Sequence, residues 1–257
     1  MLNNLNVAIT RPKQQGLQLQ QALAEVSISS ICQPLFDYQL STSKENILDQ
    51  ISSLQPQIII FVSIAAVKYA DQALSLPQWL NNNQQVFAVG EKTQQALAQL
   101  GIQAICPTKQ NSEGLLSLAQ LSKQQLDLPP NKTNILIVRG DGGRELLADE
   151  LKSRGANVQY LESYQRIWQQ LSAQQLAIWR DKKINTIVIT SNALLKRVVD
   201  LLGTTDNYWQ NTCLWIVASE RISQTAQQLG LKNVINAHGA DHQSIVTTLL
   251  NMEPEND

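Results

Sequence analysis

Short apolar runs alternate with stretches of helical apolar spacing along most of this chain. The clearest runs are Ile58–Val62, Ile135–Val138 and Thr186–Thr190. Continuous apolar runs are typical of parallel strands covered on both faces, and apolar residues three or four positions apart are typical of helices. Their alternation predicts an α/β fold of parallel sheets flanked by helices.

Further elements follow from the same pattern. The other predicted strands are Val7–Thr10, Ser30–Pro34, Gln85–Val89, Ala104–Cys106, Val158–Leu161, Leu214–Ala218 and Asn233–Asn236. The predicted helices are Gly16–Glu25, Glu45–Leu54, one starting near Ala65, Thr93–Leu100, Leu115–Leu121, Arg144–Arg154, Ala173–Lys182, Ala193–Leu202, Glu220–Leu229 and Asp241–Leu250. Leu35–Leu40 and Glu162–Arg166 are predicted to be connectors.

Several short motifs occur twice at a nearly constant spacing. The matched pairs are Arg11 with Arg139, Ser63 with Ser191, and Val89–Lys92 with Ala218–Arg221. The first two pairs are 128 positions apart and the third is 129 apart. A repeat of this length is the size of a domain, so it indicates two related lobes rather than a solenoid. The polar, proline-bearing segment Leu128–Thr133 separates the copies.

Composition narrows the class of protein. Hydrophobic residues are 43% of the chain and charged residues 16%, as in ordinary soluble globular proteins. A formal net charge of −1 argues against a general binder of nucleic acid or of membrane surfaces. There is neither a signal segment nor a run of about 18 apolar residues, so we expect a cytoplasmic protein. Cys32, Cys106 and Cys213 are few and far apart, so no disulfide framework or zinc site is predicted.

Small hydroxyl residues, glycines and arginines directly follow several predicted strands. Because the carboxyl ends of parallel strands share one edge of a sheet, and each lies at a helix start with unpaired N–H groups, these positions predict an anion-binding edge. The candidate binding residues are Thr10, Arg11, Ser63, Gly90, Lys92, Thr93, Arg139, Gly140, Ser191, Asn192, Ser219 and Ser223. For Ser63, Ser191 and Thr93, helix capping is the alternative interpretation.

No strong catalytic or metal-binding motif is present. The loop that follows Ile135–Val138 is rich in glycine, but its glycine spacing does not match the dinucleotide fingerprint, and no P-loop occurs. This absence disfavours a nicotinamide-dependent oxidoreductase. His238 and His242 are four positions apart, a spacing that can hold a metal, yet they flank Gly239 without a nearby cysteine. We therefore predict no metal site.

Taken in order along nearly the whole chain, a set of short motifs resembles the uroporphyrinogen-III synthase family. The motifs are Val7–Pro12, Phe61–Val67, Ala88–Thr93, Ile137–Arg144, Tyr164–Arg166, Thr190–Ser191 and the Gly-Leu pair at Gly230. Two positions depart from the expected pattern. Val62 stands where the family often has threonine, and Ser219 stands where the first copy has Gly90.

The resemblance implies two similar lobes, each a parallel sheet flanked by helices, joined by a two-stranded β ladder. One lobe is expected to be discontinuous, with residues 1–34 and 168–257, and the other to hold residues 41–160. The ladder is expected at residues 35–40 and 161–167. Such a ladder would allow the lobes to close over a ligand.

The resemblance also implies the reaction. Hydroxymethylbilane, a linear acidic tetrapyrrole, is cyclised to uroporphyrinogen III with loss of water and inversion of the terminal pyrrole ring, a carbon–oxygen lyase step in tetrapyrrole and haem biosynthesis. No metal or redox cofactor is implied. Tyr164 matches the family's tyrosine and is the catalytic candidate, with a role in protonating or orienting the departing hydroxyl. Packing within the ladder is the alternative role for this tyrosine.

The expected partners follow from this resemblance. The enzyme that forms hydroxymethylbilane is a candidate partner, nucleic acid and membranes are not expected, and the resemblance implies a monomer. An alternative function is a bilobed cytoplasmic protein that binds or senses a small anion without catalysis. Excess isomer III over isomer I from hydroxymethylbilane would distinguish the enzyme from that alternative.

Overall fold

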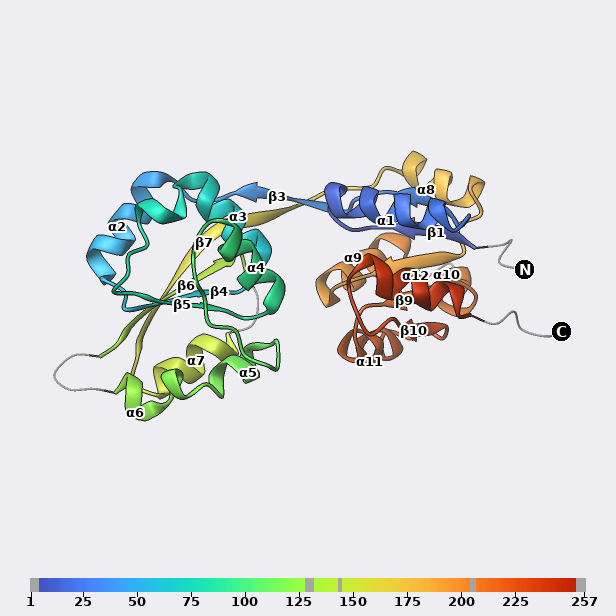
Figure 1. Ribbon diagram of the computed structural model, residues 1–257. Helices are drawn as coiled ribbons and strands as arrows, with labels where there is room; N and C mark the ends of the chain where they lie inside the picture. Colours follow the sequence, from blue (N-terminus) through green and yellow to red (C-terminus); the bar gives the residue numbers. More distant parts are fainter. Residues whose placement is uncertain (1–4, 128–131, 143–144, 204–206, 253–257) are drawn as a thin grey trace. The chain divides into compact units, whose positions relative to one another are not determined.

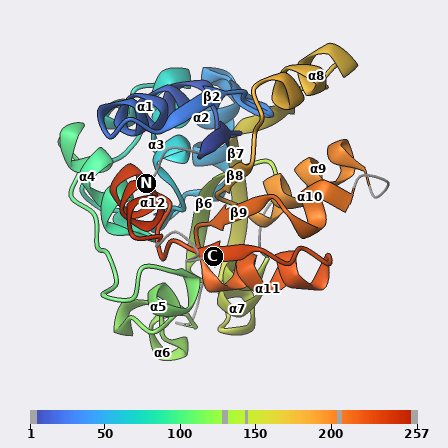
Figure 2. The same ribbon diagram turned by 90° about the vertical axis from the view of Figure 1, so that its right-hand side faces the viewer.

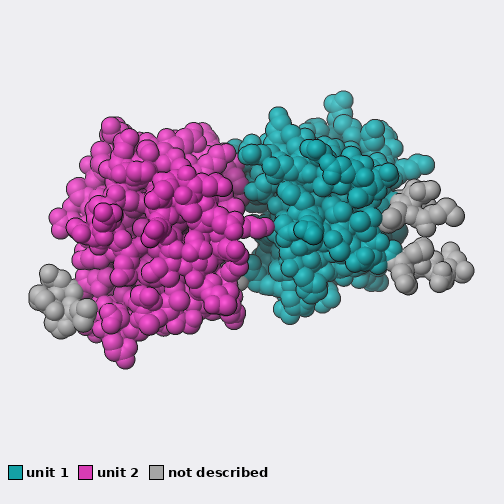
Figure 3. Space-filling model, viewed as in Figure 1, with its two compact units in different colours: residues 1–37, 167–257 teal, residues 38–166 magenta. Residues whose placement is uncertain are grey.

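A computed structural model describes residues 5–127, 132–142, 145–203 and 207–252. The chain forms two compact units (Figure 3): Met1–Asp37 with Ile167–Asp257, called here the discontinuous unit, and Tyr38–Arg166, called the middle unit. Each unit is built on one five-stranded sheet. The chain runs from the discontinuous unit into the middle unit along strand β3 (Phe36–Leu40) and returns along β7 (Asn157–Trp168).

The discontinuous unit has the strand order β10-β9-β8-β1-β2, and neighbouring strands are parallel. The strands are β1 (Asn6–Ile9), β2 (Ser29–Cys32), β8 (Thr186–Ile189), β9 (Leu214–Val217) and β10 (Val234–Asn236). The helices are α1 (Lys13–Glu25), α8 (Ala173–Asp181), α9 (Asn192–Leu202), α10 (Asn207–Asn211), α11 (Glu220–Gln228) and α12 (His242–Leu250). Helices α1 and α12 pack against one face of this sheet, and Figure 2 shows α9 and α11 on the other side from α12.

The middle unit has the strand order β3-β7-β6-β4-β5. Its remaining strands are β4 (Ile58–Phe61), β5 (Gln85–Ala88) and β6 (Asn134–Gly140). Its helices are α2 (Lys44–Leu54), α3 (Ile64–Ala73), α4 (Glu91–Gln99), α5 (Ser112–Leu116), α6 (Lys123–Leu126) and α7 (Leu146–Ser153), with 3₁₀ turns at Leu76–Gln78 and Ala119–Leu121. Helices α2, α3 and α4 cover one face, and α5, α6 and α7 cover the other (Figure 1).

Strand β4 shows why the apolar runs are continuous. Ile59 and Phe61 pack in the core on the α3 side, whereas Ile58 and Ile60 pack in the core on the α7 side. Successive side chains of a strand point to opposite faces, so a strand covered by helices on both faces is apolar at every position. The α/β fold with parallel sheets flanked by helices is therefore confirmed.

The repeat seen in the sequence is also present in the strand pairing. Strand β1 pairs with β8 through Val7 and Thr186, and β6 pairs with β4 through Ile135 and Ile58. Ile135 lies 128 positions after Val7, and Thr186 lies 128 positions after Ile58, so the two pairs are equivalent in the repeat. Strand β9 lies beside β8 as β5 lies beside β4. The two units thus share the order of four strands, to which the discontinuous unit adds β10 beside β9 and the middle unit adds β3 beside β7.

Some predicted elements differ from the structure. Residues Ala104–Cys106 form no strand but a single bridge between Ile105 and Phe87. The predicted helix Leu115–Leu121 is broken into α5 and a 3₁₀ turn, because the Ser117 hydroxyl donates to the Gly114 carbonyl at 2.6 Å and helps end α5. The two connectors, in contrast, agree with the expected two-stranded ladder, since β3 and β7 are neighbours in the middle sheet.

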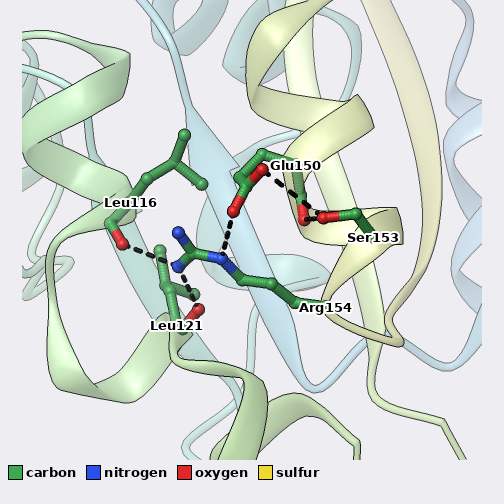
Figure 4. Close-up of polar contacts among 5 residues, drawn as sticks. All are labelled: Leu116, Leu121, Glu150, Ser153 and Arg154. Carbon is green, nitrogen blue, oxygen red and sulfur yellow. Dashed lines mark hydrogen bonds and ion pairs between the residues drawn. The ribbon is translucent and has the colours of Figure 1, made fainter.

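Arg154, just after α7, fixes the broken segment in place (Figure 4). Its Nη1 donates to the carbonyl oxygens of Leu116 and Leu121, both at 2.7 Å, and its Nε donates to Glu150 at 2.9 Å. A helix leaves its last carbonyls without intrahelical partners. One guanidinium therefore satisfies the carbonyls that end α5 and the 3₁₀ turn.

Candidate functional site

The predicted binding residues gather at the carboxyl edge of the sheet in each unit. In the discontinuous unit, Thr10 and Arg11 follow β1, Ser191 and Asn192 follow β8, and Ser219 follows β9. Strands β1, β8 and β9 are adjacent, so these positions share one edge. Ser223 lies in the second turn of α11. The edge arrangement expected from the sequence is present in this unit.

Thr10 and Arg11 are buried at that edge. The Thr10 hydroxyl is fully buried and donates to the Val188 carbonyl at 3.0 Å, which ties β1 to β8. The Arg11 side chain is 7% exposed, and its Nη2 donates to the Gln15 amide oxygen at 3.2 Å. Both side chains make contacts within the fold, and their contact with a substrate stays a prediction.

The serines that start α9 and α11 differ from each other. Ser191 caps α9 by accepting a hydrogen bond from the Leu194 N–H at 3.2 Å. Ser219 is in the N-cap position of α11 but makes no capping bond with its side chain. Asn192 keeps a buried amide oxygen without a hydrogen-bond partner among the described residues, and Ser223 is buried. Ser219 and Asn192 therefore offer polar groups that the fold does not use.

The middle unit brings together Ser63 after β4, Gly90 after β5, and Arg139 and Gly140 at the end of β6. These three strands are adjacent, in the order β6-β4-β5. In the first turn of α4, Lys92 is exposed and Thr93 is buried. This unit thus repeats the edge of the discontinuous unit.

Gln110 is a residue that sequence reasoning missed. Its amide oxygen accepts a hydrogen bond from the Glu91 N–H at 3.2 Å, and its amide nitrogen donates to the Glu91 carboxylate at 3.4 Å. The start of α4, where Gly90 has no side chain to act as a cap, is thus partnered by a residue from a later loop. No local sequence signal marks such a contact.

The Arg139 side chain bonds residues that follow it in the chain. Its Nη1 donates to the Glu145 carboxylate at 2.9 Å, and its Nε donates to the Gly140 carbonyl at 3.2 Å. The guanidinium also lies 4.4 Å from the centre of the Tyr160 ring, a cation–π distance. The Arg139 charge is therefore paired inside the unit, and its role toward a substrate carboxylate stays a prediction.

Tyr160 and Glu145 shift each other's pKa values. The Tyr160 hydroxyl donates to the Glu145 carboxylate. Burial and this hydrogen bond raise the pKa of Tyr160 to about 12. The hydrogen bonds from Tyr160 and Arg139 lower the pKa of Glu145 below its ordinary value, because they stabilise the ionised carboxylate.

Tyr164 lies in a cluster of three tyrosines and one serine. Its side chain is 5% exposed, and its hydroxyl lies 3.3 Å from the Ser63 hydroxyl. The Tyr164 ring meets Tyr38 edge-on, with centroids 4.8 Å apart, and lies 5.7 Å from Tyr69. The Tyr69 hydroxyl donates to the Tyr38 carbonyl at 3.0 Å. Burial raises the pKa of Tyr38, and the nearby Tyr164 makes a smaller contribution in the same direction.

The structure brings Tyr164 and Ser63 together, although they are 101 positions apart. Sequence reasoning named both residues but not their contact, and it gave no role to Tyr38 or Tyr69. Tyr69 lies three positions from the buried Ala66 and next to the buried Ala70 on α3, so helical spacing places it toward the sheet. That spacing is the signal that marks Tyr69 as part of this cluster.

The hollows of the middle unit lie away from the carboxyl edge of its sheet. One of about 580 Å³ is at the amino ends of β4, β6 and β7. It is lined by Gln55, Gln57, Lys132, Asn134, Lys152, Ala156, Asn157 and Val158. Several of its polar groups bond one another, as Asn157 does with the Asn134 amide oxygen at 2.9 Å. We favour the carboxyl edge as the site, because the N–H groups that begin the crossover helices lie there.

The described residues include neither a metal-binding cluster nor a helix that could span a membrane. In that part of the chain, no three or more His, Cys, Asp or Glu side chains form a group able to hold a metal ion. The helices described there are all too short or too polar to cross a bilayer.

Comparison with known proteins identifies the family. The family model described as "Uroporphyrinogen-III synthase HemD" matches residues 18–247. The uroporphyrinogen-III synthase of Escherichia coli (strain K12) is 28% identical, over 95% of this chain and 100% of its own length. The Salmonella typhimurium protein of the same name is 30% identical, also over 95% of this chain and 100% of its own.

Solved structures agree in fold. A mutant uroporphyrinogen III synthase from the extremely thermophilic bacterium Thermus thermophilus gives a TM-score of 0.66 at 14% identity, covering 97% of this chain and 100% of its own. The corresponding Helicobacter pylori 26695 structure gives 0.60 at 14% identity with the same coverage. At this identity the likeness concerns the fold, whereas the family match spans most of the sequence. The chain belongs to the uroporphyrinogen-III synthase family.

Proposed function

We propose that this chain converts hydroxymethylbilane to uroporphyrinogen III, as a carbon–oxygen lyase of tetrapyrrole and haem biosynthesis. The observation that carries the proposal is the family match over residues 18–247. The paired hydroxyls of Tyr164 and Ser63 at the carboxyl edge of the middle unit support it, because the reaction needs a proton donor for a departing hydroxyl. A non-catalytic anion sensor is less favoured, because such a protein would need only the anion-binding edge and would have no use for the paired hydroxyls.

Tyr164 is the proposed proton donor. The carbon–oxygen bond breaks with its electron pair on oxygen, the oxygen takes the phenol proton and leaves as water, and an azafulvenium cation remains. The substituted carbon of the terminal ring attacks this cation to give a spiro intermediate, and fragmentation and reclosure invert the ring. The carbon that closes the macrocycle then loses a proton, which returns to Tyr164.

The burial of Tyr164 supports this role. A proton donor that is 5% exposed keeps bulk water away from its hydroxyl, and exclusion of water would protect a reactive cation from hydrolysis. Ile64, directly after Ser63, is a large apolar residue that is 49% exposed. An exposed apolar side chain beside the hydroxyl pair suits the face of a pyrrole ring.

The substrate carboxylates are proposed to bind at the helix starts along both carboxyl edges. The groups best suited to this role are the uncapped start of α11 at Ser219 and the exposed Lys92. Donors of this kind can bind the carboxylates of an acidic ligand even though the net charge of the chain is only −1.

The proposal extends to the setting of the reaction. Loss of water with ring closure involves no net oxidation, so the proposed reaction needs no redox cofactor. We also propose a monomer that works in the cytoplasm and receives its substrate from the enzyme that makes hydroxymethylbilane.

The test supplies freshly made hydroxymethylbilane to the purified protein and separates the porphyrinogen isomers after oxidation. The proposal predicts an excess of isomer III over the isomer I that forms spontaneously. Isomer I alone, with unchanged kinetics, would rule out catalysis. Binding of the substrate in that same sample would then favour the anion-sensing alternative.

A further inference from the structure

Strand β7 carries an extra residue beside the proposed proton donor. Arg139 of β6 pairs with Glu162, but the next residue, Gly140, pairs with Tyr164, so Ser163 has no partner in the register. Side chains alternate along a strand, and one inserted residue reverses which face the following side chain points to. Tyr164 consequently packs in the same core cluster as Leu161, on the α3 side of the sheet.

The unpaired Ser163 holds this bulge. Its side chain is fully buried, and its hydroxyl lies 3.2 Å from the carbonyl oxygens of both Ala66 and Arg139. The first contact reaches α3 and the second reaches β6. The hydroxyl therefore fixes β7 against both neighbours at the residue before Tyr164.

Gly140 provides the space for the Tyr164 ring. A Cβ atom at residue 140 would lie 2.4 Å from Cε2 and Cζ of that ring. Carbon atoms in contact are about 3.5–4.0 Å apart, so any other residue would push the ring away. Glycine is needed here for the close approach of an aromatic ring.

Ser63 holds the hydroxyl of the same tyrosine. The Ser63 oxygen accepts a hydrogen bond from the Ala66 N–H at 3.1 Å, as the cap of α3. A serine hydroxyl has one proton to donate and two lone pairs. With one lone pair used by the cap, its proton is available to the Tyr164 oxygen 3.3 Å away.

The repeat offers an internal comparison. Ser191, the counterpart of Ser63, also caps its helix. However, the position 128 residues before Gly140 is Pro12, whose ring would not leave the space that Gly140 leaves. The combination of capping serine and glycine at these positions is therefore found in the middle unit, on which the proposed chemistry depends.

We propose that Gly140, Ser163 and Ser63 are positioning residues for Tyr164, with Ser63 donating a hydrogen bond to the tyrosine oxygen as that oxygen gives up its proton. This inference rests on the proposed function. The phenol proton leaves with the substrate hydroxyl as water, and the negative charge left on Tyr164 is stabilised by the Ser63 O–H at the start of α3. The proton released on ring closure restores the phenol.

The first experiment needs no substrate. Urea unfolding is measured for wild type, Gly140→Ala, Tyr164→Ala and the double variant, as a double-mutant cycle. We expect Gly140→Ala to lower the midpoint clearly in the wild-type background and to have little further effect once the Tyr164 ring is removed. An equal drop in both backgrounds would show that Gly140 does not make room for the ring and would overturn its assignment.

The second experiment follows isomer III formation. Ser63→Ala is expected to lower kcat about tenfold with KM changed less than about twofold, the behaviour of a group that acts in the transition state. Ser63→Thr, which keeps the hydroxyl, should restore most of kcat. Ser43→Ala, which removes the equivalent cap of α2, should leave kcat unchanged. In the Tyr164→Phe background, Ser63→Ala should cost nothing further.

Two outcomes of this second experiment would overturn the role of Ser63. One is that Ser63→Ala lowers kcat by the same factor in the wild-type and Tyr164→Phe backgrounds. The other is that Ser63→Ala raises KM and leaves kcat unchanged. The two experiments also separate the inference from the function on which it rests. If the wild-type protein forms no isomer III, the proposed function fails, while the unfolding cycle still reports whether Gly140 accommodates Tyr164.

Discussion

At the scale of single residues, equivalent positions in the two copies have different contacts. Arg11 and Arg139 occupy matching sites in the sequence, but Arg11 bonds Gln15 on α1, whereas Arg139 pairs with Glu145 and stacks on Tyr160. The sequence correctly indicated that both lie near the carboxyl end of a strand, although β6 extends through Arg139 whereas β1 ends before Arg11. It did not indicate these partners, because each is chosen by the packing of side chains around it.

The Tyr160–Glu145 pair makes a pH prediction. Folding raises the pKa of Tyr160 from near 10 to about 12, so its stabilising contribution is complete below about pH 10 and is lost as the pH rises through about 12. Glu145→Gln removes the carboxylate that helps to hold this proton. Ultraviolet difference titration should show one tyrosine ionising near 12 in the wild type and at a lower pH in the variant.

The matched control for that titration is Glu162→Gln, an exposed carboxylate on the same strand as Tyr160. It should leave the high ionisation unchanged. Tyr160→Phe should remove that ionisation altogether. If Glu145→Gln leaves the midpoint near 12, the hydrogen bond does not contribute to the shift and burial alone explains it.

At the scale of elements, periodicity predicted most strands and helices because burial decides their pattern. The continuous apolar run of β4 is buried on both faces, and Ser63 and Ser191 cap helices that start where expected. The helix predicted at Leu115–Leu121 is interrupted by a local contact, the Ser117 hydroxyl bond to the Gly114 carbonyl, and by a contact outside its own sequence. Its carbonyls are bound by Arg154, more than 30 positions away, and a local pattern carries no trace of that contact.

Removing the Arg154 guanidinium tests its importance for the middle unit. Arg154→Met keeps the apolar stem but leaves the Leu116 and Leu121 carbonyls without this donor. Hydrogen bonds from a charged donor contribute about 1.5–3 kcal/mol, so we expect a loss of roughly 2 kcal/mol in the free energy of unfolding. Urea denaturation measures the change.

Lys152→Met is the control for this variant, since Lys152 is exposed on α7. It should change the free energy of unfolding by less than about 0.5 kcal/mol, as is usual for surface positions. Equal stability of Arg154→Met and Lys152→Met would mean that water replaces the guanidinium without cost.

At the scale of the whole molecule, the repeat had the greatest predictive value. The sequence repeat predicted two related lobes. Its spacing of 128 positions relates the pairs Val7–Thr186 and Ile135–Ile58, and the two sheets share the order of four strands. It also foretold which strand ends meet at an edge. It did not foretell the bulge at Ser163 that turns Tyr164 toward Ser63, because a single inserted residue breaks the alternation on which such reasoning relies.

The central claim is that Tyr164, held beside Ser63, donates the proton that releases water from the substrate. The most direct measurement is the single-turnover rate of isomer III formation by Tyr164→Phe, with substrate binding measured on the same variant. General acid catalysis typically contributes at least about a hundredfold, and a phenol is a weak acid, so we predict a loss of about 10- to 100-fold with binding and fold unchanged. Isomer III formed by Tyr164→Phe at the wild-type rate would contradict the account.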